Sequence, residues 1–223
     1  MPLKPAVRED RQYRPLGVVA VGAAVLFAVV ALWVVRAPGR LLPGDAGLHH
    51  WSVGHRPDVA AALARAITDT ATGVVPYALV VLAGLFAGRT RRRRVTAAVG
   101  LALCLAVGQA LRFGAMKLIA RPRPDAVYWA ADASRWSFPS GHATTAAMTA
   151  GLLIAALYLR GSPVPRSSVV LIAAWAATVG LTRIYLGVHW FTDVVGGWLF
   201  ATAWLALAAC AFLRLTGRRP AAR

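Results

Sequence analysis

The sequence predicts an all-α integral membrane protein, a bundle of about six transmembrane helices with both termini in the cytoplasm. Three observations support this fold class. Hydrophobic residues make up 58% of the 223 residues and the mean hydropathy is +0.59, against roughly 45–50% apolar residues in a soluble domain. The apolar residues gather in runs of about 20, the length of helix that spans a bilayer core of about 30 Å. The polar segments between these runs alternate between short basic loops and longer loops rich in Pro, Gly, His and Trp.

Six apolar segments are candidate spans. They cover residues 16–35, 68–88, 95–113, 143–159, 169–187 and 190–213. The first is almost uninterrupted Val, Ala, Gly and Leu. The second is the least regular, because Arg65 and Asp69 lie in its approach, and we place an interfacial stretch before it. The sequence shows no internal repeat, so residues 1–223 are expected to form a single membrane domain.

Basic residues predict the orientation of the bundle, because Lys and Arg accumulate in short cytoplasmic loops. The basic segments are the tail 1–15, the run 89–94, the loop 160–166 and the tail 214–223. With six spans, these segments all fall on one side, which we take as the cytoplasm. The extracytoplasmic side of the cell membrane then carries residues 36–67, 114–142 and 183–190.

The charge of the chain favours an anionic lipid partner. The formal net charge is +17, from 25 Lys and Arg against 8 Asp and Glu. These charges cluster between apolar runs rather than along one helical face, so we expect contact with a bilayer and no nucleic-acid partner. Cys104 and Cys210 lie inside apolar runs and indicate neither a disulfide nor a metal site. Asp125 and Asp132 are too scattered for a carboxylate metal site, so no metal or other cofactor is expected. The oligomeric state stays open.

Three polar clusters lie at predicted span ends on the extracytoplasmic side. They read KLIARPRP at 117–124, FPSGH at 138–142 and TRIYLGVHWFTD at 182–193. In the second cluster, Ser140 and Gly141 stand just before an apolar helix, whose free N-terminal amides attract anions. Ordinary capping by Ser140 is the alternative interpretation. His142 favours chemistry at this position, because an imidazole exchanges protons near neutral pH.

The third cluster pairs a histidine with a carboxylate. His189 and Asp193 are four residues apart, which on a helix places them one turn apart on the same face. The carboxylate can then fix the imidazole tautomer and strengthen the other ring nitrogen as a nucleophile. A structural hydrogen bond is the alternative, but ionisable residues near a bilayer are costly and favour function. Arg183 brings a guanidinium fork that suits a phosphoryl group.

Together these motifs resemble the type-2 phosphatidic acid phosphatase family, which includes glucose-6-phosphatase and the vanadium haloperoxidases. The resemblance runs from Lys117 to Asp193. It implies that His189 attacks phosphorus to form a phosphohistidine, that Asp193 orients it, and that His142 protonates the leaving oxygen and later activates water. The residues expected to bind the phosphate are Arg123, Arg183, Ser140, Gly141 and Lys117.

The first motif departs from the family pattern. The family usually has six residues between the Lys and the Arg of the last Arg-Pro, whereas five separate Lys117 from Arg123 and Met116 takes the lysine position. The third motif opens with Thr182 in place of the common Ser, which keeps the hydroxyl.

The resemblance implies metal-independent hydrolysis of a lipid phosphate or diphosphate at the extracytoplasmic face. Phosphatidic acid, phosphatidylglycerol phosphate and a polyprenyl diphosphate are all compatible substrates. An anion-binding transporter without hydrolysis is the alternative, which the position of the polar residues at span ends disfavours. A haloperoxidase is disfavoured because those relatives are largely soluble.

Overall fold

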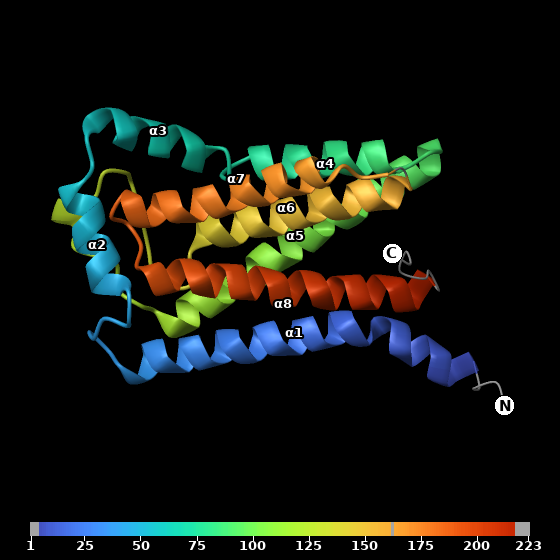
Figure 1. The fold of residues 1–223 in the computed structure, drawn as a ribbon, viewed down its shortest axis with the longest axis horizontal. Helices are drawn as coiled ribbons and strands as arrows, with labels where there is room; N and C mark the ends of the chain where they lie inside the picture. The colour runs from blue at the N-terminus through green and yellow to red at the C-terminus, as the bar shows by residue number, and fades with distance from the viewer. Residues whose placement is uncertain (1–4, 162, 217–223) are drawn as a thin grey trace.

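The long apolar segments of the sequence fold as long helices packed side by side (Figure 1). A computed structural model describes residues 5–161 and 163–216, and the regular elements within these ranges are helices, without strands. They are α1 (Pro5–Arg36), α2 (Asp45–Gly54), α3 (Asp58–Asp69), α4 (Val75–Ala87), α5 (Arg91–Ile119), the 3-10 helix η1 (Ala126–Tyr128), α6 (Gly141–Arg160), α7 (Arg166–Tyr185) and α8 (Phe191–Thr216). The predicted all-α class is confirmed.

Five helices are long and apolar enough to cross a membrane. They are Arg14–Arg36 within α1, and the whole of α5, α6, α7 and α8. Each covers most of one predicted span. The largest difference is in α5, which begins at Arg91 and continues to Ile119, beyond the predicted 95–113. Basic residues near both ends of α5 are compatible with this length, since long Lys and Arg side chains reach the membrane surface from within a span.

The predicted span 68–88 is not one helix, and this expectation was wrong. α3 ends at Asp69 and α4 begins only at Val75. In the turn between them, the hydroxyls of Thr70 and Thr72 donate to backbone carbonyls at 2.6 and 3.0 Å, in place of a helical ladder. Gly73 adopts a positive φ of 57°, which further ends the helical path. α4 has 13 residues, too few for a full span alone, but α3 and α4 together run along the length of the bundle (Figure 1).

α6 forms the centre of the bundle. Half of its spanning window is buried, against 11% of the window in α1. One core cluster brings Met148 and Leu152 of α6 against Val80 of α4, Leu105 of α5 and Ala201 of α8. The outer helices instead expose large apolar side chains, as a lipid-facing surface requires. Examples are Val18 of α1, 71% exposed, and Leu171 of α7, 69% exposed.

The two ends of the bundle differ in character. α1 begins and α8 ends at one end, where the basic α4–α5 and α6–α7 connections also lie (Figure 1). The predicted tail 1–15 is already helical from Pro5, while residues 1–4 and 217–223 of the two predicted tails lie outside the described residues. The other end carries α2, the start of α3 and the segment 120–140 (Figure 1). The predicted polar clusters therefore all lie at the end opposite the basic connections.

Close contact between α4 and α5 depends on Gly84. A methyl group at Gly84 would lie 2.3 Å from the Cα atom of Ala98 in α5, so the two helices would have to move apart. We expect Gly84→Ala to lower the free energy of unfolding by about 1–3 kcal/mol, measured by thermal unfolding of the purified protein in detergent. Gly100→Ala is the matched control, because nothing lies within 4 Å of its added methyl group. Equal unfolding midpoints for the two variants would contradict this packing.

Candidate active site

The three polar clusters meet around one cavity at the end of the bundle opposite the basic connections. The cavity has a volume of about 400 Å³ and lies between α5, the segment 132–135, the start of α6, the end of α7 and the turn before α8. Five of the predicted site residues line it: Arg123, Gly141, His142, Arg183 and His189. These residues come from different helices and connections, so the fold of the bundle is what brings them together.

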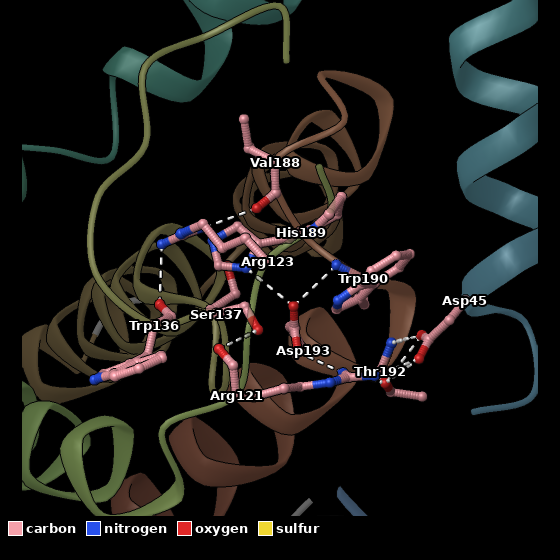
Figure 2. A network of polar contacts seen from close by, with 12 residues as sticks. Asp45, Arg121, Arg123, Trp136, Ser137, Val188, His189, Trp190, Thr192 and Asp193 are labelled. Carbon is pink, nitrogen blue, oxygen red and sulfur yellow. Dashed lines mark hydrogen bonds and ion pairs between the residues drawn. The ribbon is translucent and has the colours of Figure 1, made fainter. Parts of the chain in front are cut away.

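His189 and Asp193 contact one another as their spacing predicts. His189 Nδ1 lies 3.3 Å from Asp193 Oδ2, and Oδ2 also accepts a hydrogen bond of 2.9 Å from the backbone N–H of Trp190 (Figure 2). His189 lies in the turn before α8, and Asp193 lies in the first turn of that helix. The start of α8 therefore fixes the carboxylate beneath the imidazole.

Arg123 determines which nitrogen of His189 carries the proton. Its Nη1 lies 2.9 Å from His189 Nε2. A guanidinium can only donate, so Nε2 is the unprotonated acceptor and Nδ1–H donates to Asp193. Burial lowers the pKa of His189 well below its ordinary value, and the charges of Arg123 and Arg183 lower it further. At neutral pH the ring is therefore neutral, with a lone pair on Nε2 as a nucleophile requires.

Backbone carbonyls hold the guanidinium of Arg123 in place. Nη1 donates to Val188 O at 2.7 Å, and Nη2 donates to Ser134 O at 2.9 Å and to Trp136 O at 3.0 Å. Nε donates to Arg135 O at 3.2 Å. The carbonyls of the segment 134–136 thus hold the guanidinium of Arg123 next to His189.

Ser140 and Gly141 form the start of α6. Ser140 is the N-cap residue, but its hydroxyl makes no capping hydrogen bond, is buried, and has no hydrogen-bond partner. Ordinary side-chain capping is therefore excluded as the reason for this serine. The free hydroxyl and the N-terminal amides of a long helix make a site suited to an anion.

Arg183 is almost fully buried yet weakly bonded. It is 2% exposed, and its Nη1 lies 3.4 Å from Thr68 Oγ1, a long hydrogen bond. Its Nε has no hydrogen-bond partner. Because Arg183 lines the same cavity as His142 and His189, its guanidinium has donors available for an anion bound there.

Lys117 does not join these residues. Its Nζ lies 4.7 Å from the centre of the Phe113 ring, and the side chain lines a neighbouring cavity of about 450 Å³ rather than the one that contains His189. The structure therefore does not bring Lys117 together with the other residues that were expected to bind the phosphate. The physical reason is its one-residue offset from the motif position, which turns a side chain by about 100° around the helix.

A buried ion network behind His189 was missed by the sequence analysis. Arg121 Nη1 donates to Asp193 Oδ1 and Arg121 Nη2 donates to Asp45 Oδ2, both at 2.6 Å (Figure 2). Asp45 also accepts from the backbone N–H and the hydroxyl of Thr192, each at 2.9 Å. One feature of the sequence indicated part of this network: the RPRP run contains a second arginine, Arg121, two residues before Arg123. Asp45 gave no such indication, because it lies 76 residues before Arg121 and has no motif around it in the sequence.

The PAP2 superfamily model matches residues 97–216, more than half of the chain. The chain belongs to the PAP2 superfamily. This region contains every predicted site residue and every residue that lines the cavity described above. The polar network around Asp45 reaches it from outside the matched region.

Known proteins share the PAP2 fold of this chain. A transmembrane PAP2-type phosphatidylglycerolphosphate phosphatase from Bacillus subtilis superposes with a TM-score of 0.73 over 89% of this chain and 98% of its own, at 22% sequence identity. LpxE from Aquifex aeolicus superposes with a TM-score of 0.61 over 78% of this chain and 99% of its own, at 20% identity.

A curated relative is similar in sequence. An undecaprenyl-diphosphatase from Sulfolobus acidocaldarius is 27% identical over 131 residues, which cover 53% of this chain and 54% of the relative. The aligned part of the chain thus spans about half the length of the curated relative.

Loss of Arg121 should destabilise the protein strongly. Asp45 and Asp193 are both fully buried, and removal of Arg121 leaves them unpaired. We expect Arg121→Gln to lower the free energy of unfolding by about 3–5 kcal/mol, as for other broken buried ion pairs. Addition of Asp45→Asn should recover part of this loss, which a double-mutant cycle of unfolding measurements quantifies.

Arg40→Gln is the control for this cycle. Arg40 is exposed, and its side chain takes part in none of the ion pairs of the described residues. We expect no measurable change in its unfolding. Strictly additive effects of Asp45→Asn and Arg121→Gln would contradict a network.

Proposed function

We propose that this PAP2 protein is a lipid phosphatase, which hydrolyses a lipid phosphate or diphosphate through a phosphohistidine on His189 and without a metal ion. The observation that carries this proposal is the position of His189. Its Nε2 lies 2.9 Å from Arg123 Nη1 at a cavity that Arg183 also lines, while Nδ1 lies 3.3 Å from Asp193 Oδ2. In the described part of the chain, no group of three His, Cys, Asp or Glu residues is placed to hold a metal ion.

The first step transfers the phosphoryl group to the protein. The lone pair of His189 Nε2 attacks phosphorus, a nitrogen–phosphorus bond forms and the bond from phosphorus to the leaving oxygen breaks. His142 lies in the same cavity. It takes up a proton as the phosphate anion binds and donates this proton to the leaving oxygen. Nδ1–H keeps its hydrogen bond to Asp193, which stabilises the positive charge that develops on the ring.

The second step returns the protein to its starting state. His142, now neutral, accepts a proton from a water molecule as the water oxygen attacks phosphorus. The nitrogen–phosphorus bond breaks and inorganic phosphate leaves. In both steps the charge on the non-bridging oxygens grows, and Arg183, Arg123 and the amides at the start of α6 are placed to stabilise it.

A lipid substrate suits the surroundings of the site. The neighbouring cavity, lined by Phe113, Met116 and Trp136, shares residues with the catalytic cavity and offers an apolar wall next to it. An acyl or prenyl chain can follow this wall into the bilayer while its phosphate reaches His189. Phosphatidic acid, phosphatidylglycerol phosphate and a polyprenyl diphosphate all fit this description. The last two correspond to the names of two similar proteins, the phosphatidylglycerolphosphate phosphatase and the undecaprenyl-diphosphatase.

We further propose that the site faces the extracytoplasmic side of the cell membrane and that the chain acts as one membrane domain with cytoplasmic termini. The arginine run that opens α5, the α6–α7 connection and the end of α8 all lie at the end of the bundle opposite the site. Basic residues favour the cytoplasmic side, which supports this orientation.

Phosphate release in detergent tests the reaction. In the presence of EDTA, we expect the unaltered protein to release phosphate from at least one of the three lipids. His189→Gln should lower the rate about 10⁴-fold or more, because it removes the nucleophile. His50→Gln is the matched control, since His50 is an exposed histidine outside the cavity.

Two outcomes of this assay contradict the proposal. Equal rates for the unaltered protein and His189→Gln remove His189 from the mechanism. Absence of hydrolysis for every lipid, together with retained phosphate binding, favours an anion-binding transporter.

Cysteine labelling tests the orientation. Cys104 and Cys210 are replaced by Ala, and a single cysteine is then introduced as Val127→Cys near the site or Arg92→Cys in the basic run. Val127 is 82% exposed, and Arg92 is also exposed. In intact cells, a membrane-impermeant maleimide should label only Val127→Cys. Labelling of Arg92→Cys alone would contradict the proposed orientation.

A further inference from the structure

The cavity contains an arginine that neither the motifs nor the mechanism uses. Arg112 lies inside the spanning helix α5, one turn before Met116, and its side chain lines the cavity together with His142, Arg183 and His189. An ionisable residue within a membrane span is costly and is expected to have a function.

The guanidinium of Arg112 lacks a partner that matches its charge. Its Nη1 donates to Met116 Sδ at 3.4 Å, and a thioether sulfur is a weak acceptor. Its Nε is buried without a hydrogen-bond partner. In the described ranges, no ion pair includes Arg112.

The two arginines of the first motif differ from Arg112 in this respect. Carbonyl oxygens surround Arg123, and two carboxylates neutralise Arg121. Arg112 therefore brings a positive charge into the cavity that the protein itself leaves unbalanced. An anion in the cavity is the group that would balance it.

Arg112 also lies directly at the start of α6. A methyl group at Gly141 would lie 3.4 Å from Arg112 Nη1 and 3.6 Å from its Cζ. The guanidinium thus covers the first residue of the helix whose amides attract anions. A phosphoryl group at these amides would lie within reach of Arg112 on one side and of Arg183 in the same cavity.

We propose that Arg112 is a phosphate-binding residue of this site and supplies the cation missing at Met116. This inference rests on the proposed function. One turn of helix separates the two positions, and the longer arginine side chain compensates for that distance, since its Nη1 reaches the sulfur of Met116. Lys117, the nearest alternative cation in the sequence, packs on Phe113 in the neighbouring cavity.

Steady-state hydrolysis of the best lipid substrate tests this assignment. Arg112→Gln should lower kcat/KM about 10²-fold, as expected for loss of one group that stabilises transition-state charge. Arg112→Lys should lie between this variant and the unaltered protein, because it keeps the charge but loses the fork. Lys117→Gln is the matched control and should keep a kcat/KM close to that of the unaltered protein. The reverse order of Arg112→Gln and Lys117→Gln would overturn the proposal.

A rescue variant separates binding from a structural role. Addition of Met116→Lys to Arg112→Gln places a cation on the same helical face one turn later, and should recover a substantial part of kcat/KM. The unfolding midpoint of Arg112→Gln should not fall, since no ion pair is lost. Failure of both Arg112→Lys and the Met116→Lys double variant to exceed Arg112→Gln would assign Arg112 a structural role.

Binding of inorganic phosphate distinguishes failure of this inference from failure of the proposed function. Isothermal titration of the detergent-solubilised protein should show weaker phosphate binding by Arg112→Gln than by the unaltered protein, even if no lipid tested is hydrolysed. If the unaltered protein hydrolyses lipid and both proteins bind phosphate equally, the inference fails while the phosphatase proposal stands.

Discussion

The arrangement of the site depends on the buried guanidinium of Arg121. The guanidinium donates to Asp193 and Asp45 at 2.6 Å each. The backbone carbonyl of Arg121 accepts hydrogen bonds from the N–H and hydroxyl of Ser137. Four segments that are distant in sequence are thereby tied together: the start of α2, the turn after α5, the approach to α6 and the start of α8. Two fully buried carboxylates could not lie here without this cation, because each would be an unpaired charge away from water.

This network divides the charges of the site into two groups. Arg121 is balanced inside the protein, so Asp193 keeps its second oxygen for His189 and Trp190. Arg112 and Arg183 line the cavity, and neither pairs with a carboxylate in the part of the chain that the structure describes. They give the cavity a positive charge that a phosphate would balance. The N-terminus of α6 also lies at this cavity, and its free backbone amides add to the attraction for an anion. In the proposed mechanism, the orientation of His189 and the attraction of a phosphate are thus tasks of different arginines.

The sequence predicted those features that depend on short spacing or on composition. The five long apolar helices followed from apolar length. The contact between His189 and Asp193 was predicted from helical spacing, although His189 lies in the turn just before α8 and only Asp193 lies on the helix. The break between α3 and α4 was missed because the Thr and Gly residues of the turn sit in an otherwise apolar run. Asp45 and Arg112 could not be assigned from sequence, because their roles depend on which distant helices pack against them. Lys117 lies at the neighbouring cavity because the motif fixes its position in sequence but not its direction around α5.

If His189 attacks phosphorus, a phosphohistidine forms during turnover, and trapping this intermediate is the most direct test. The detergent-solubilised protein is mixed with a polyprenyl diphosphate or lipid phosphate labelled at the terminal phosphate, quenched in alkali, digested and analysed by mass spectrometry. We expect a phosphoryl group on His189 that is absent from His189→Gln. Hydrolysis by the unaltered protein with inversion at a chiral phosphorus, or with the label on a different residue, would contradict it.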